Sequence, residues 1–158
     1  MPVPDMVYLS TPTDTSSTAY GVTGEIRVHL HPTFGMQYYR MIQNNRGSAI
    51  PAGQLCAFDT GNPLKVTLAG ASTLAASCAG VAVVEIPNGH FGWVVCRGQV
   101  SADANGTTTA GELCRPVAGG QITGDATPSS SVEAAQIIGF WPEGSAGSGL
   151  KTAYITII

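Results

Sequence analysis

Charged side chains are scarce in this chain of 158 residues, and none of them are clustered. Asp, Glu, Lys and Arg make up 11% of the sequence, and the formal net charge is −3. The seven basic residues are scattered along the chain. A protein that binds DNA or RNA by neutralising phosphates needs a basic patch or stripe. We therefore expect no nucleic-acid partner.

Long apolar runs are also missing. No stretch approaches the roughly 18 consecutive apolar residues of a membrane-spanning helix. The first residues, Met1-Pro-Val-Pro-Asp, contain neither the basic region nor the apolar region of a secretory signal. We expect a soluble protein that is made in a cytoplasm and has no membrane partner.

Catalytic motifs are absent as well. The sequence contains no Gly-x-Ser-x-Gly elbow, no phosphate-binding loop and no His-Glu-x-x-His pair. Its ten acidic residues are spread along the chain, mostly in predicted turns. We therefore expect no enzymatic activity, no catalytic residues and no cofactor.

The four cysteines do not form a Cys-x-x-Cys pair, which argues against a zinc site. Each lies in or beside an apolar run, where a free cysteine behaves as a small hydrophobic residue. We expect four reduced, structural thiols, although an even number also permits disulfide pairing. The four are Cys56, Cys78, Cys96 and Cys114.

Glycine and proline, in contrast, are abundant, with 20 and 10 residues. This composition is typical of many short strands joined by turns, and the length fits one domain. The sequence is organised around Cys78 to Gly98, where two apolar runs flank Pro87-Asn88-Gly89. Asn-Gly favours a tight hairpin turn, and consecutive apolar residues indicate that both faces are covered. We expect an all-β domain, either a barrel or a sandwich.

A short motif occurs twice. Ala52-Gly53-Gln54-Leu55-Cys56 returns as Ala110-Gly111-Glu112-Leu113-Cys114, and 111 − 53 = 58. Each copy is followed by a glycine in an apolar run, Gly80 and Gly139, and 139 − 80 = 59. Two copies are too few for a solenoid. We expect two pseudo-repeated halves, about 36–100 and 101–158, within one domain of residues 25–158; chance recurrence is the alternative.

Residues 25–31 alternate strictly between polar and apolar side chains. This pattern predicts a half-buried strand with Ile26, Val28 and Leu30 toward the core. His29 and His31 share the polar face, where a metal pair is conceivable. We expect a solvated strand face there instead, without a metal.

Residues 1–24 are rich in Pro, Thr and Ser and show little periodicity. They read as an extended N-terminal arm that cannot fold alone. Val7, Tyr8 and Leu9 form its only compact apolar group. The arm is either a frayed terminus or a segment that docks on a neighbouring subunit, and in the second case these three residues are the candidate interface.

The order of features from residue 36 to 158 resembles the small capsid cement, or head decoration, proteins of phages. The residues that carry the resemblance are Ile50 to Leu55, Ala79 to Ala82, Gly89 to Gly98 and the echo at Ala110 to Leu113. The resemblance implies a β-rich structural module, often a homotrimer, without catalytic residues. It also implies binding to the major capsid protein on the outer surface of the virion capsid.

A domain of a tail fibre or a carbohydrate-binding β domain is the alternative function. Exposed aromatic side chains lining a concave site would favour it. Tyr38, Tyr39, Trp93 and Trp141 lie in predicted strands, which indicates core or interface positions.

Overall fold

The computed structural model describes residues 12–19 and 21–157, and it confirms an all-β fold. Helical structure is limited to α1 (Ser131–Ala134) and two single turns, η1 (Ala75–Ser77) and η2 (Ala118–Gly120). The strands are β1 (Ile26–His31), β2 (Gly35–Asn44), β3 (Leu55–Asp59), β4 (Asn62–Leu68), β5 (Cys78–Ala82), β6 (Phe91–Ala104), β7 (Leu113–Pro116), β8 (Ile122–Asp125), β9 (Gly139–Phe140) and β10 (Gly149–Thr156).

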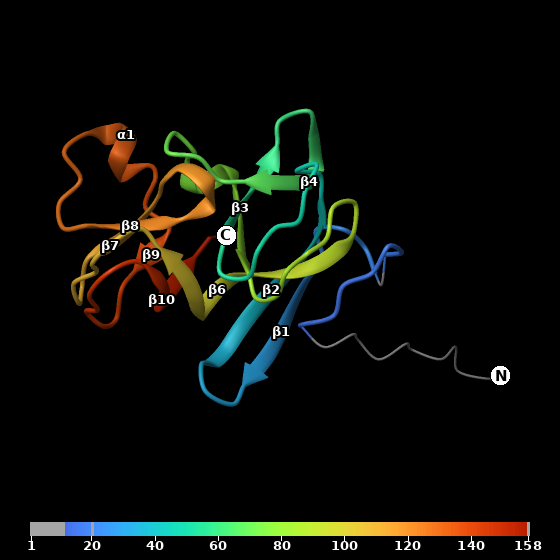
Figure 1. Cartoon of the computed structure of the whole chain (residues 1–158), viewed down its shortest axis with the longest axis horizontal. Coiled ribbons are helices and arrows are strands. Elements are labelled where there is room, and N and C mark those ends of the chain that lie inside the picture. The colour runs from blue at the N-terminus through green and yellow to red at the C-terminus, as the bar shows by residue number, and fades with distance from the viewer. Residues whose placement is uncertain (1–11, 20, 158) are drawn as a thin grey trace.

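The strand pairing closes two rings that share β6 (Figure 1). Ring one runs β2-β4-β3-β5-β6 and returns to β2, while ring two runs β6-β8-β7-β9-β10 and returns to β6. Strand β6 is 14 residues long, so its first part serves ring one and its second part serves ring two. Of the two architectures expected from the sequence, the structure therefore has the barrel type, twice.

Equivalent hydrogen bonds show that the two rings are a structural repeat. Gly53 N donates to Ala82 O at 2.7 Å, and Gly111 N donates to Trp141 O at 2.8 Å. The isolated bridge Ile50↔Ile86 in ring one corresponds to Thr108↔Ser145 in ring two. These pairs keep the spacings of 58 and 59 residues read from the sequence, which confirms the pseudo-repeat.

Gly80 and Gly139 also occupy equivalent places, opposite Cys56 and Cys114. A Cβ at Gly80 would lie 2.6 Å from Val95 O, and one at Gly139 would lie 1.9 Å from Tyr154 O. Both backbones approach the neighbouring strand too closely for any side chain. The recurrence of glycine at this spacing thus has a steric cause.

The interior is divided between two clusters of buried side chains. Members of the smaller cluster all belong to ring one: Ile42, Ile50, Cys56, Val66, Ala79, Ala82, Ile86 and Val94. The larger cluster fills ring two and the layer between the rings, where Trp93 and Trp141 are its largest members. The two rings therefore pack against each other through a continuous core.

The predicted facing of β1 is wrong. Ile26, Val28 and Leu30 are 47%, 59% and 75% exposed, whereas the polar side of the strand faces the body of the protein. The reason is position, since β1 pairs only with β2 among the described strands and projects beyond ring one. A strand outside the rings has no core to receive its apolar face.

A second prediction also differs from the structure. Residues 135–141 were expected to form one strand, but β9 contains only Gly139–Phe140. Helix α1 precedes it, and the Ser130 side chain caps this helix by accepting a hydrogen bond from Glu133 N at 3.2 Å. The cap fixes a helical turn here.

Part of the predicted N-terminal arm is described, and it contacts the rings. Ser16 forms a bridge with Phe91, and Gly24 N donates to Met41 O at 2.7 Å. Val7, Tyr8 and Leu9 lie outside the described residues. The division into an arm of 24 residues and a domain stays a prediction.

Candidate docking surface

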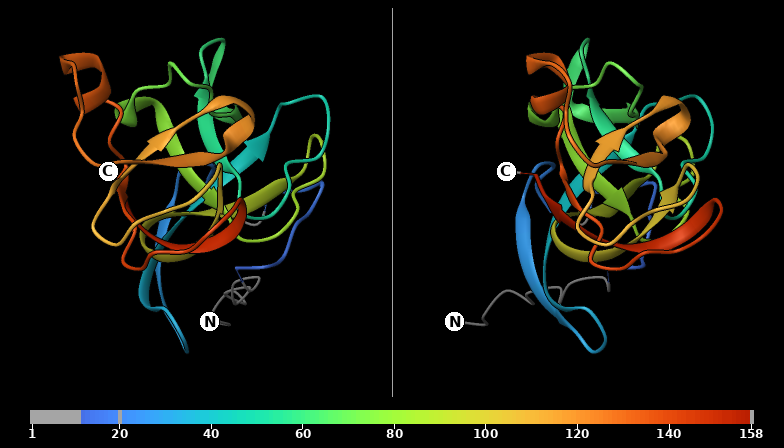
Figure 2. Two further views of the ribbon diagram at one scale, coloured as in Figure 1. Left: turned by 60° about the vertical axis from the view of Figure 1, so that its left-hand side comes forward. Right: turned by 90° about the vertical axis from the view of Figure 1, so that its left-hand side faces the viewer.

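The β1–β2 hairpin projects from the rings. Its strands pair in antiparallel register from Ile26↔Arg40 to His31↔Gly35. Figure 1 and both views of Figure 2 show the blue β1 and the cyan start of β2 extending past the rings, away from α1. A projecting two-stranded ribbon presents two faces, and both differ from an ordinary solvated surface.

The outer face of the hairpin is apolar. Val28 lies opposite Tyr38, and Leu30 lies opposite Met36, which is 58% exposed. We call Ile26, Val28, Leu30, Met36 and Tyr38 the apolar stripe. Contiguous exposed apolar side chains of this kind mark contact sites for other molecules.

Strand β1 adds a second feature to this surface. Its outer edge makes no strand pairing among the described residues. An open edge offers unpaired backbone donors and acceptors to another chain. The hairpin thus combines an apolar face with an available edge, both on one projecting element.

On the inner face, Arg27 is held firmly. Its Nε and Nη2 donate to the two carboxylate oxygens of Glu25 at 2.9 and 3.0 Å. The guanidinium lies over the Trp93 ring, 5.2 Å from its centroid. The hydrogen bond and charge of Arg27 lower the pKa of the Glu25 carboxyl, so the pair stays ionised at neutral pH.

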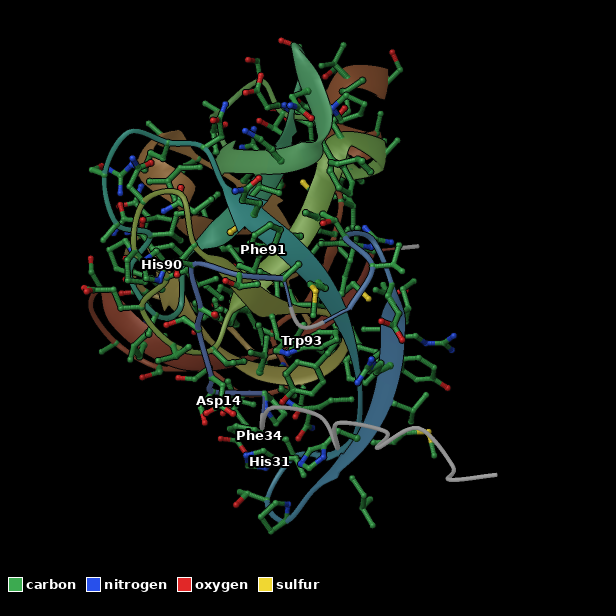
Figure 3. All side chains as sticks on the ribbon, turned by 90° about the vertical axis from the view of Figure 1, so that its right-hand side faces the viewer. Asp14, His31, Phe34, His90, Phe91 and Trp93 are labelled. Atoms are coloured by element: carbon green, nitrogen blue, oxygen red, sulfur yellow. The ribbon has the colours of Figure 1, made fainter. Side chains whose placement is uncertain are left out.

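Between this inner face and the rings lies a cavity of about 560 Å³, which we call the hairpin cavity. Tyr39 lines it and donates its hydroxyl hydrogen to Gln37 Oε1, while Gln37 Nε2 donates to Gln99 O. Burial raises the pKa of Tyr39 to about 12, so the phenol remains a donor at neutral pH. Figure 3 shows Trp93 beneath the hairpin and His31 and Phe34 near its tip.

The aromatic residues of the cavity are not arranged as a sugar platform. Tyr39 and Trp93 are only 3% and 2% exposed, and Arg27 covers the Trp93 face. Phe34 is stacked on His31, with 4.8 Å between ring centroids. A carbohydrate site requires open aromatic faces, so the cavity gives the carbohydrate-binding alternative no support.

The two histidines of β1 have separate roles. His31 Nδ1 accepts hydrogen bonds from the backbone N–H groups of Thr33 and Phe34, both at 3.1 Å, and so shapes the turn. His29 lies edge-on to Tyr39, with ring centroids 6.0 Å apart. Within the described part of the chain, no group of three or more His, Cys, Asp or Glu residues could hold a metal ion.

All four cysteines are free and buried, as expected from the sequence. Burial raises the pKa of the Cys56 and Cys78 thiols to about 12, and it also raises the pKa of Cys96 and Cys114. The thiols are therefore protonated at neutral pH and serve as packing groups.

The sequence predicted two faces for β1 but assigned the wrong one to the core. Strict alternation shows that the two faces differ without showing which one is covered. One clue was available in Glu25 and Arg27, two residues apart on one side of a strand, where they can form the observed ion pair. An ion pair of this kind can lie against the body of a protein as readily as in solvent.

Comparisons with known proteins identify a shared fold and no family. No family model and no curated protein matches the chain. Among solved structures, the N base of head fiber gp8.5 of bacteriophage phi29 matches with a TM-score of 0.56 at 18% sequence identity. The match covers 75% of this chain and 94% of that one. In the described part of the chain, no helix has the length and apolar character to cross a membrane. The chain therefore has the fold of a phage head fiber base.

Proposed function

We propose that this chain is a structural protein of a phage head, bound to the outer surface of the capsid as a cement or decoration protein. The observation that carries the proposal is the fold shared with the N base of a phage head fiber. The resemblance of residues 36–158 to cement proteins supports it independently. The proposed role is non-enzymatic and needs no cofactor.

The proposed partner is the major capsid protein, and the proposed contact is the apolar stripe. Val28 and Leu30 are 59% and 75% exposed on a projecting element, so they can reach a flat shell before the rings do. Burial of apolar surface contributes about 25 cal/mol per Å². Multiple copies on one shell would add many such contacts.

The test uses shells assembled from the major capsid protein of the phage whose genome carries this chain. The intact protein is expected to sediment with these shells, and V28S/L30S is expected to remain in the supernatant. The matched control is Leu64→Ser, because Leu64 is 58% exposed on β4, in ring one. If the intact protein fails to sediment, the cement function is wrong; if V28S/L30S binds normally, the stripe is not the contact.

We further propose that the protein is a homotrimer, as in many cement proteins. The low charge and the apolar stripe support self-association. Light scattering gives the mass in solution, and cryo-electron microscopy of decorated shells gives the assembly on the capsid. A trimer is expected in at least one of the two. Monomers in both would exclude the trimer and leave the cement function to be judged by sedimentation.

A further inference from the structure

The hairpin cavity is bordered by the start of the described chain. Pro12 and Thr13 line it, together with inner-face residues such as His29 and body residues such as Val100 and Leu150. Most of its walls are apolar, and its volume of about 560 Å³ is large enough for several side chains. An apolar hollow of this size next to a chain segment is a candidate site for that segment.

A buried donor at this cavity lacks an acceptor. Arg27 uses Nε and Nη2 on Glu25, but its Nη1 is buried without a hydrogen-bond partner among the described residues. A buried donor without an acceptor costs about 1–3 kcal/mol. The occupant of the cavity should therefore carry an acceptor oxygen as well as apolar side chains.

The N-terminal arm meets both requirements and can reach. Leu9 precedes Pro12 by three residues, and three extended residues span at most about 11 Å. Val7, Tyr8 and Leu9 supply apolar side chains, and their carbonyl groups and the Tyr8 hydroxyl are acceptors. A tether this short gives a high effective concentration, so docking within one chain is favoured over docking between chains.

We propose that Val7, Tyr8 and Leu9 occupy the hairpin cavity of their own chain. Their apolar side chains pack against its walls, and one of their oxygen atoms accepts a hydrogen bond from Arg27 Nη1. The docked segment then links the hairpin to the rings and fixes the direction of the apolar stripe. This inference is independent of the proposed capsid function, because it concerns the isolated chain.

A cross-linking experiment on the full-length protein tests the placement. Leu9→Cys is combined with His29→Cys, because His29 lines the cavity. The control combines Leu9→Cys with Leu64→Cys on β4. The four native thiols are buried and protonated, so mild oxidation at neutral pH acts on the two introduced ones.

The expected result for L9C/H29C is a disulfide within one chain. Free thiols under denaturing conditions then fall from six, the four native ones plus two, to four, while the mass stays that of a monomer. The L9C/L64C control is expected to keep all six. A cross-link between chains would show that the arm docks on a neighbour, and a failure to cross-link would show that it does not enter the cavity. Either result overturns the proposal.

A second measurement needs no introduced cysteines. Acrylamide quenching reports the exposure of Trp93, with a W93F background to subtract the contribution of Trp141. Y8A/L9A is expected to increase quenching of Trp93 relative to the intact chain, and the matched control S10A is expected to leave it unchanged. Equal quenching in Y8A/L9A and the intact chain would overturn the proposal.

Discussion

Ring one and ring two have the same backbone pairing but different interiors. Trp141 in ring two stands where ring one has Ala82, as the equivalent hydrogen bonds from Gly53 and Gly111 show. Smaller residues offset its bulk, since ring two has Ala102 at the spacing of about 60 residues from Ile42 in ring one. Cores tolerate such redistribution when the total volume is kept. The repeat is therefore conserved in its hydrogen bonds and not in its packing.

The rings also differ at the end closed by the isolated bridge. In ring one the bridge is apolar, and Gly92 leaves room for Ile86, whose side chain lies 2.9 Å from where a Cβ would be. In ring two the position 59 residues later is Lys151. Its ammonium group donates to Gly106 O at 2.7 Å, Ser145 O at 2.8 Å and Gly147 O. One ring is closed by packing and the other by a charged donor.

The largest effect is expected from Trp141→Ala, because it empties ring two and leaves ring one intact. The loss should be about 3–5 kcal/mol in the free energy of unfolding, measured in urea. Adding Ala102→Ile and Ala153→Val, which copy the ring-one residues Ile42 and Val94, should recover part of it. If the triple variant is no more stable than W141A, the two interiors are not equivalent in volume.

Next in size are the two close-approach glycines. Gly139→Ala should lower the free energy of unfolding by about 3 kcal/mol, and Gly80→Ala by less, because the Cβ–oxygen distances are 1.9 and 2.6 Å. Gly111→Ala is the control, since a Cβ there meets nothing within 4 Å and only its φ of 84° costs energy. That control should lose about 1–2 kcal/mol. Thermal unfolding ranks the three, and G111A as the least stable would contradict the steric explanation.

Lys151→Met should cost about 2 kcal/mol, because three carbonyl groups lose a charged donor. The loss should be accompanied by faster hydrogen exchange in the loops around Gly106 and Gly147, measured by mass spectrometry. Lys65→Met removes a lysine from ring one and serves as the control. Equal effects of the two substitutions would show that the ammonium cluster does not close ring two.

The smallest effect on stability is expected in the element that ring two lacks. V28S/L30S alters exposed side chains of the hairpin and should change the free energy of unfolding by no more than about 0.5 kcal/mol. Urea unfolding measures this directly. Ile86→Ser, inside ring one, is the contrasting substitution and should be strongly destabilising. A large loss in V28S/L30S would mean that the stripe is part of the folded core.

The sequence by itself determined the fold class, the repeat and the turns. Gly53 and Gly111 adopt positive φ angles of 83° and 84°, and Gly80 and Gly139 contact a neighbouring strand, so local geometry required glycine at recurring positions. The hairpin of β7 and β8 was likewise readable from its glycine turn and flanking apolar residues. These features depend on short-range sterics, which each residue carries with it.

Only the tertiary structure decided that β6 serves both rings, because strand sharing depends on partners far apart in the sequence. It also decided that Val28 and Leu30 face outward and that Arg27 and Tyr39 enclose a cavity. An alternating strand has two distinct faces, and the position of the rest of the protein selects which face is buried. For β1 the rings lie on the polar side, and the apolar side is left as a surface for binding.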